Sequence, residues 1–546
     1  MQQDHSAAAP LVYAIVLGSL VLFIIFRSLL QVAFELFFGP ISSIWEAKRA
    51  HPFTLRLRNW VAKHFIYKSF FSRASFHSRG WSFAIALYVT ASLCCVLVKA
   101  ADTAEVGVRA GHVALINLLL LFTGPCLHFA ADVAGFSLRT QKQIHAAAGY
   151  TVAIVATIHT FALLSRTQSF PVATPSNLFA ILSISAILLL LVPISPLSRF
   201  LPYELLLLIH HVLPYFLGYF VWRHIPHKNL LPRLYTYILL GVFALALLAQ
   251  LTITLIRCRF WFHSARISCR LGFVKITLHL RKPLRIRPGQ YIDLWIPSSV
   301  GSIFQSHPMS VVSWSSGPQR LLFLCAQVQN GFTSTLLTQV KYGDTTSIAM
   351  FTGPHGVTLP LHSYDQVLLI ATDLGVVALL PYMQCLAYES HFIGSRTKRI
   401  HLVWRLKDWS LIQVLKAPLN AVLETDESGG DIREGTFTRI LESVISISIY
   451  GQSDKTNDDE EALKVLKESS RVELQCGQWN LSAVVEKDTA SSNVSLGHSG
   501  KASAIAASVS PDIRAELNDI VKKNIQHVDL MYTDYQPEGY RDDRKE

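Results

Sequence analysis

Charged residues are scarce in this sequence. Asp, Glu, Lys and Arg make up 16% of the 546 residues, 51% are hydrophobic, and the mean hydropathy is +0.34. The excess of hydrophobic over charged residues comes mainly from one half of the chain, because nearly all long apolar runs lie in residues 1–257. Residues 258–546 lack such runs and resemble an ordinary soluble protein. The length allows two or more domains, so we expect a membrane part followed by a soluble part.

Paired cysteines and nucleic-acid modules are also missing. The eight cysteines form no CxxC pair and no metal-site spacing, which argues against a disulfide framework and a zinc site. The net charge of +12 is accompanied by no basic-aromatic module, so we predict no nucleic-acid partner. The densest basic cluster, between Lys48 and Arg79, flanks an apolar run and is better explained as a signal for membrane orientation.

Seven apolar stretches are candidates for transmembrane helices. The first, Leu11 to Phe26, has no Lys or Arg ahead of it, which favours a retained span over a cleaved signal peptide. The others lie at about residues 82–99, 111–134, 143–165, 177–195, 202–222 and 233–257. Basic residues follow the first and the last stretch, so both exits and the soluble half are predicted to be cytosolic.

Two of these stretches carry histidines fourteen residues apart, His145 with His159 and His210 with His224. At about 100° per residue, fourteen steps return to within roughly 40° of the starting face after a rise of about 21 Å. Two such helices side by side would offer bis-histidine ligands for two stacked haems. His211 lies thirteen residues before His224, about 140° away, so we predict His210 as the ligand. For a single histidine, a hydrogen-bonding role in the bundle is the alternative.

The soluble half changes its pattern part-way along. From about residue 262 to 350, short alternating runs between Pro and Gly predict a small antiparallel barrel. From about 366, strand-like runs alternate with helical segments, which is typical of a parallel α/β domain. Residues 425–436, 452–462 and 487–505 are polar or rich in Gly and Ser, and we predict them to be surface insertions.

With these motifs in this order, the chain resembles the fungal ferric reductases, in the superfamily that includes the NADPH oxidases. The resemblance covers roughly residues 80 to 535. It rests on the two His-x13-His helices, on YE six residues before His210, on the ending WRH at His224, and on the soluble motifs below. It implies a transmembrane helical bundle, an FAD-binding β-barrel and an NAD(P)-binding α/β domain of the ferredoxin-NADP reductase type. The implied domains are 1–80 (first helix and basic segment), 81–257 (six-helix haem domain), 258–362 (FAD) and 363–546 (NAD(P)).

The barrel carries the implied flavin segment. RPGQYIDLWIP (287–297), followed by QSHPMSVVS, is similar to the family's segment with the core His-Pro-aromatic-Ser/Thr. Met309 stands where the aromatic residue is usual, and a Pro-bounded barrel strand is the alternative interpretation. NGFTSTLL (330–337) opens a predicted helix, whose N-terminus is suited to bind phosphate. The predicted flavin contacts are His307, Pro308, Ser310, Ser313, Gly331 and Thr333.

The nucleotide motifs are only partly kept. GPHG (353–356) matches the family's Gly-Pro-x-Gly loop, and VLLIATDLGVVALLPYM has its strand, turn and helix, where glycines let the backbone approach a pyrophosphate. The predicted contacts are Gly353, Pro354, Gly356, Thr372 and Gly375. Asp373 replaces an expected glycine, and Gln478 in CGQW replaces the Arg of a Gly-Arg-Pro element. These two departures leave the choice between NADPH and NADH open.

The resemblance implies an NADPH-dependent ferric-chelate reductase. Electrons would pass from cytosolic NADPH through FAD and two b-type haems to extracytosolic ferric or cupric chelates. We predict no catalytic side chain, since the redox chemistry belongs to the cofactors. A multi-pass protein of the plasma membrane is expected, with downstream metal-uptake proteins as partners.

Two alternatives remain. An NADPH oxidase would make superoxide, but Leu163 lies where such oxidases often carry a second histidine one turn beyond the outer ligand. A non-enzymatic haem protein with a decayed nucleotide site would account for Asp373 and Gln478.

Overall fold

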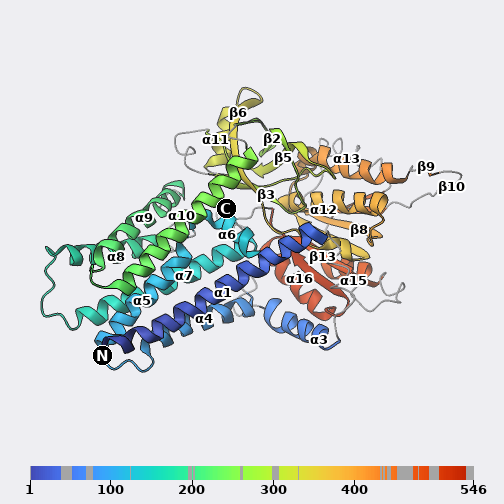
Figure 1. The fold of residues 1–546 in the computed structure, drawn as a ribbon. Helices are drawn as coiled ribbons and strands as arrows, with labels where there is room; N and C mark the ends of the chain where they lie inside the picture. Colours follow the sequence, from blue (N-terminus) through green and yellow to red (C-terminus); the bar gives the residue numbers. More distant parts are fainter. Residues whose placement is uncertain are drawn as a thin grey trace. The chain divides into compact units, whose positions relative to one another are not determined.

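The computed structural model divides the chain into two units (Figure 1). One consists of Met1–Ala33 with Ser82–Arg257, and the other of Phe34–Trp81 with Cys258–Glu546. The residues that the structure describes are 2–38, 52–68, 78–122, 124–194, 200, 203–258, 262–297, 306–329, 331–430, 433–434, 437–438, 444–451, 471–476, 479–490 and 503–535.

The first unit is a bundle of apolar helices, and the predicted multi-pass membrane protein is confirmed. Among the described residues, six helices are long and apolar enough to span a membrane, and α8 is a shorter apolar helix. Within the bundle α5 packs on α7, and α8 packs on α9. The helices are α1 (Gln2–Phe38), α4 (Arg79–Leu97), α5 (Thr103–Leu121), α6 (Leu127–Ala134), α7 (Leu138–Leu164), α8 (Pro175–Leu190), α9 (Tyr203–His224) and α10 (Leu230–Cys258).

The third predicted span, 111–134, is wrong as one continuous helix. The helix begins earlier because the Asp102 carboxylate accepts a hydrogen bond from the Glu105 backbone N–H at 2.8 Å, which caps its first turn. It ends at Leu121, and a short 3-10 turn leads to the separate helix α6. Gly135, with φ of 69°, then ends α6 in the left-handed conformation that glycine adopts without strain.

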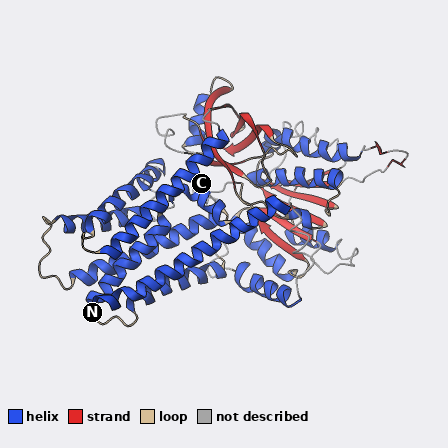
Figure 2. Cartoon of the chain, in the orientation of Figure 1, coloured by secondary structure: helices blue, strands red, loops and turns tan. Residues whose placement is uncertain are grey.

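The second unit contains the predicted antiparallel barrel. Its sheet has the order β4-β3-β6-β1-β2-β5, and Val311, just after β4, forms an isolated bridge with Leu324 of β5. Figure 2 shows the strands of the chain in red. Alternate strand residues such as Ile276 and Leu278 fill the core. The elements are β1 (His263–Arg270), β2 (Phe273–Leu284), β3 (Tyr291–Trp295), β4 (His307–Ser310), β5 (Gln319–Gln327), α11 (Phe332–Gln339) and β6 (Thr345–His355).

The predicted parallel α/β domain follows. Its six strands have the order β12-β11-β8-β7-β13-β14 and are all parallel. Helices α12 and α13 cover one face, and α15 and α16 cover the other (Figure 1). The elements are β7 (Gln366–Thr372), α12 (Val376–Tyr388), β8 (Arg399–Leu406), α13 (Ser410–Gly430), β11 (Ile445–Gly451), β12 (Val472–Cys476), α15 (Leu481–Ala490), β13 (Ser503–Ser508), α16 (Pro511–Lys523) and β14 (Val528–Tyr532).

Two of the predicted surface insertions begin inside regular structure. Asp426 lies in α13 and is buried, because its carboxylate pairs with His391 at 2.7 Å and with Arg471 at 2.9 Å. Asp488 lies in α15 and is buried against the sheet. Polar composition is therefore misleading where a carboxylate is paired. The third predicted insertion, 452–462, lies outside the described residues.

Candidate functional site

The four predicted haem ligands face one another in pairs at two levels of the bundle. The ring centroids of His145 and His210 are 6.2 Å apart, as are those of His159 and His224. A metal ion bound between two imidazoles lies about 2 Å from each ligating nitrogen. When the distance from each nitrogen to its ring centre is added, the two ring centroids are expected at roughly the separation observed. Each pair therefore fits one metal ion held between two rings, as in the axial ligation of haem iron.

The pair formed by His159 and His224 is oriented by backbone carbonyls. His159 Nδ1 lies 2.7 Å from the Gly107 carbonyl oxygen, and His224 Nδ1 lies 3.0 Å from that of Ser176. A carbonyl can only accept, so each Nδ1 is the protonated nitrogen and Nε2 is left to bind a metal. Such a second hydrogen bond is typical of metal-ligating histidines because it sets the tautomer and the ring plane.

Glycines opposite α7 make room for both of its histidines. A Cβ atom on Gly111 of α5 would lie 2.9 Å from His159 Nδ1, and one on Gly124 would lie 3.2 Å from Cε1 of His145. Neither glycine was singled out from the sequence; Gly111 lies within α5 and Gly124 in the turn that follows it. His211 is exposed, whereas the ring of His210 faces that of His145, and the assignment of His210 as the ligand stays a prediction.

Arg233 of α10 holds the chain that follows His224. It is buried, and its guanidinium donates to the carbonyl oxygens of Ile225 at 3.0 Å and Pro226 at 3.3 Å. It also lies 5.6 Å from the ring centroid of Trp222. A cation at a helix C-terminus satisfies free carbonyls and favours the helix dipole.

The predicted flavin segments meet at the start of α11. The His307 ring stacks on Phe332, the first residue of α11, at a centroid distance of 4.1 Å. Gly331, which precedes it, has φ of 93°, a conformation that favours glycine. The backbone N–H groups of this helix start suit a phosphate. Ser310 Oγ donates to the Tyr535 carbonyl at 2.5 Å, which brings the last described residue to the same strand.

Two of the predicted flavin contacts have partners within the protein. Ser313 Oγ accepts from the Phe323 backbone N–H at 3.0 Å, so it ties two barrel segments together. Thr333 Oγ1 accepts from the Gln329 N–H at 2.7 Å and donates to its carbonyl at 2.9 Å. Pro308 lies in β4 opposite Asp293 of β3. Ser310 is also bonded within the protein, to the Tyr535 carbonyl. Flavin contact by His307, Ser310 and Gly331 stays a prediction.

The GPHG loop packs on the turn that precedes β3. Gly353 and Gly356 have φ of 111° and 102°, and a Cβ atom on either would lie 3.2–3.3 Å from a backbone oxygen or a ring atom of residues 289–291. Pro354 lies between them at the end of β6. Their close backbone approach explains the glycines, and nucleotide contact by this loop stays a prediction.

Gly289 joins the barrel to the α/β domain. A Cβ atom on it would lie 2.1 Å from the hydroxyl of Tyr382 in α12. That hydroxyl accepts from the Leu359 backbone N–H at 2.9 Å. Burial raises the pKa of Tyr382 well above its usual value, so the hydroxyl stays protonated at neutral pH.

The carboxyl ends of the parallel strands gather the predicted nucleotide residues. Thr372 Oγ1 accepts from the Ser510 N–H at 2.9 Å, which links the ends of β7 and β13. A Cβ atom on Gly375 would lie 2.0 Å from the Ser508 carbonyl oxygen, so no other residue fits there. Ligands of open α/β sheets bind at this edge. The helix α12 that follows starts with free backbone N–H groups suited to phosphate.

Asp373 has a left-handed backbone conformation, of the kind that glycine adopts most readily. Its φ is +46°, which Asp tolerates better than most residues. Its carboxylate accepts from the Lys407 N–H at 2.8 Å, and its carbonyl accepts from Trp404 Nε1 at 2.9 Å. The carboxylate is therefore used to hold the end of β8. Gln478 lies outside the described residues.

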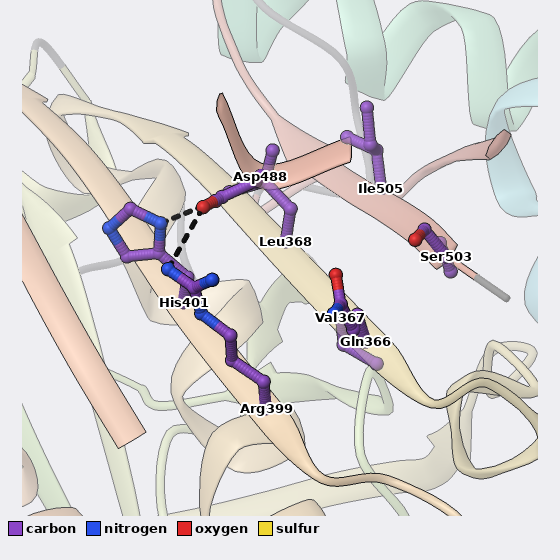
Figure 3. A pocket seen from close by; sticks show the side chains of 9 residues that line it. Gln366, Val367, Leu368, Arg399, His401, Asp488, Ser503 and Ile505 are labelled. Carbon is purple, nitrogen blue, oxygen red and sulfur yellow. Dashed lines mark hydrogen bonds and ion pairs between the residues drawn. The ribbon is translucent and has the colours of Figure 1, made fainter. Parts of the chain in front are cut away.

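A hollow at the opposite, amino edge of the sheet is lined by Gln366, Arg399, His401, Asp488 and Ser503 (Figure 3). Its charges pair with one another, since Asp488 binds His401 at 2.5 Å and Arg399 at 3.2 Å. His401 Nε2 also bonds Ser448 Oγ at 2.9 Å. This network fastens α15 to the sheet, and it lies at the edge where ligands of such sheets do not bind.

Comparison with known proteins agrees with this architecture. The profile of the ferric reductase NAD binding domain matches residues 364–532, and that of an FAD-binding domain matches residues 270–358. The chain belongs to the ferric reductase family. The helices, the barrel and the parallel sheet thus form a membrane-bound member of that family with FAD- and NAD(P)-binding domains.

Two relatives are distant. Ferric/cupric reductase transmembrane component 2 of Saccharomyces cerevisiae is 25% identical over 223 residues, 40% of this chain and 30% of that protein. Ferric reduction oxidase 8, mitochondrial, of Arabidopsis thaliana is 24% identical over 221 residues, 39% of this chain and 29% of that protein. The matches thus span less than a third of these relatives. The flavohemoglobin of Malassezia yamatoensis is 12% identical with a TM-score of 0.35, covering 78% of this chain and 95% of that one, too low a score to carry an argument.

Proposed function

We propose that this ferric reductase family member is a transmembrane NADPH-dependent reductase of ferric or cupric chelates in the plasma membrane. When bound, FAD would take a hydride from NADPH and release single electrons, which two b-type haems would carry to the outer acceptor. The observation that supports this proposal most is the arrangement of the four histidines. Their rings face each other in two pairs, with ring centroids 6.2 Å apart, in a chain that also has flavin and nucleotide domains.

The residues of this chain would position the cofactors and would not themselves react. His145 with His210 and His159 with His224 would hold the haem irons. Gly331 and Gly375 lie at the N-termini of α11 and α12, where backbone N–H groups would suit phosphate groups. The names of both relatives, a ferric/cupric reductase and a ferric reduction oxidase, support iron or copper as the acceptor.

The charge near the outer pair favours an anionic acceptor. Arg223 and Lys228 are exposed on either side of the end of α9, directly beside His224. Arg223 lies 5.2 Å from the Phe179 ring centroid, which holds its guanidinium near the helix. A cationic entrance attracts a negatively charged metal chelate more than neutral dioxygen. Downstream metal-uptake proteins would then take up the reduced ion.

The test is anaerobic reduction of the purified protein in nanodiscs. Addition of NADPH should bleach the flavin band and produce reduced b-type haem bands, and ferric chelate or cupric ion should then reverse the haem bands. NADH in a parallel sample tests the nucleotide preference. A protein with haem bands that neither nucleotide reduces would instead support the alternative of a haem protein with a decayed nucleotide site.

A superoxide-producing oxidase is the second candidate. In air, the reduced haems of an oxidase would reoxidise rapidly and superoxide dismutase-sensitive dye reduction would appear. For a metalloreductase we expect dye reduction by ferric chelate that superoxide dismutase does not inhibit.

Two substitutions, His210→Ala and His211→Ala, test which of the adjacent histidines of α9 is the haem ligand. His210 faces His145, whereas His211 is exposed, so only His210→Ala should lose the inner haem. A normal haem content in His210→Ala together with loss in His211→Ala would refute the assigned ligand set.

A further inference from the structure

The segment between the first two spans has an unusual exposed face. It consists of α3 (Pro52–Val61) and the π-helical turn Ala62–Ile66. Leu57, Trp60 and Ile66 are 50%, 54% and 55% exposed. Single exposed apolar side chains are ordinary, but three within ten residues outside a membrane span indicate a contact surface.

This segment adjoins the start of a membrane-spanning helix. The Lys68 carbonyl accepts a hydrogen bond from the backbone N–H of Arg79, the first residue of α4, at 2.6 Å. A Cβ atom on Gly80, the next residue, would lie 3.3 Å from Phe65 Cβ. Residues 65–68 therefore lie at the level where α4 enters the bilayer, whichever leaflet that is.

The other face of the segment is already in use. The Tyr67 hydroxyl donates to the Leu530 carbonyl at 3.5 Å, and Arg58 pairs with Asp529 at 3.5 Å. Both partners belong to β14 of the α/β domain, and the Tyr67 ring packs on the hydrophobic cluster beneath that sheet. Neither of these contacts covers Trp60, which remains 54% exposed.

Cations accompany the exposed apolar side chains. Lys63, His64 and Lys68 are exposed, and the His64 ring lies 5.3 Å from the ring of Trp60. A helix with Trp and Leu on its free face and Lys beside them binds in the plane of an anionic membrane surface. Trp is enriched at the level of the lipid headgroups.

From these contacts we propose that residues 57–68 form an interfacial segment whose free face binds the anionic phospholipid headgroups of the leaflet at which α4 begins. The occupant follows from the position of the segment beside a span and from its positive charge. The inference requires neither haem nor flavin, and it goes beyond the proposed redox function.

Photocrosslinking of the full-length protein tests it. Trp60 is replaced by p-benzoylphenylalanine, and the protein is reconstituted in nanodiscs of phosphatidylcholine with 30% phosphatidylserine. After irradiation, we expect peptides containing position 60 to carry lipid adducts, with phosphatidylserine enriched above its bulk share. The matched control is the same replacement at Tyr67, seven residues along, which contacts Leu530 and should crosslink to peptides around that residue.

The contribution of the lysine charges is tested with the same crosslinking experiment. Lys63→Gln with Lys68→Gln should lower the phosphatidylserine share of the adducts to its bulk value while lipid adducts persist. Adducts at position 60 exclusively with peptides of this chain would overturn the proposal. Adducts that show no preference for phosphatidylserine in the unmodified background would overturn the headgroup specificity.

Discussion

Asp373 shows how one side chain can replace a glycine without losing the turn. Its positive φ is stabilised by two hydrogen bonds, from Lys407 N–H to the carboxylate and from Trp404 Nε1 to the carbonyl. From the sequence, Asp373 was only a departure from an expected glycine. In the structure its carboxylate accepts the hydrogen bond of Lys407 N–H at the end of β8.

Substitutions at Asp373 separate the carboxylate from the backbone conformation. Asp373→Gly and Asp373→Ala both lose the hydrogen bond to Lys407, worth about 1 kcal/mol. In the alanine variant the left-handed backbone conformation still destabilises the folded state by about 1–2 kcal/mol, whereas glycine adopts it without this strain. We therefore expect thermal unfolding of the purified protein to occur at a lower temperature for Asp373→Ala than for Asp373→Gly. Equal thermal unfolding midpoints for the two variants would show that residue 373 does not keep a positive φ in the alanine variant.

Arg233 should matter for the outer histidine pair. Arg233→Met removes two hydrogen bonds from a charged donor, each worth about 1.5–3 kcal/mol, to the carbonyls that follow His224. We expect the electron paramagnetic resonance signal of one haem to broaden or to turn partly high-spin, and the other to stay unchanged. Arg223→Met is the matched control, since it removes a neighbouring exposed charge without uncapping α9. An identical spectrum for Arg233→Met and the unmodified protein would contradict this role.

At the scale of elements, α7 and α9 set the relative orientation of the imidazole planes. The planes are 70° apart in the His145–His210 pair and 82° apart in the His159–His224 pair. Near-perpendicular axial imidazoles give ferric haem a highly anisotropic low-spin signal. We expect electron paramagnetic resonance of the oxidised protein to show two such signals. A rhombic signal typical of parallel imidazole planes would contradict the helix arrangement.

At the scale of the whole molecule, α1 belongs to the membrane unit through a buried polar network. The Tyr13 hydroxyl lies 2.9 Å from Ser92 Oγ of α4 and donates to Asn117 Oδ1 of α5 at 3.0 Å. Tyr88 donates to the same oxygen. Hydrogen bonds between helices substitute for the hydrophobic effect, which cannot hold helices together in lipid.

Tyr13→Phe should loosen this attachment slightly. Such interhelical bonds average about 0.6 kcal/mol, so we expect a small decrease in the free energy of unfolding. Asn117→Leu breaks the whole network and should cost several times more. Unfolding of the protein from mixed micelles by SDS measures both, with Tyr150→Phe on an exposed site of α7 as the control. A Tyr150→Phe effect as large as that of Tyr13→Phe would show that the network is not specific.

The sequence by itself determined what depends on local geometry. Fourteen-residue spacing puts His145 and His159 on one helix face whatever surrounds them, because helix pitch is constant. The same rule separated His210 from His211. Alternation over short runs predicted the barrel, and strand–helix alternation predicted the parallel sheet, since side-chain period and burial are linked.

Only the tertiary structure decided contacts between segments far apart in the chain. Thr372 meets Ser510 across 138 residues, and no local pattern announces that pairing. The direction of the Asp373 carboxylate depends on where β8 ends, and the use of Arg233 depends on how α10 returns beside α9. The basic segment before α4 looked like a simple orientation signal, but its docking on β14 leaves Trp60 facing outward. Such pairings follow from the packing of whole elements, which composition and period do not encode.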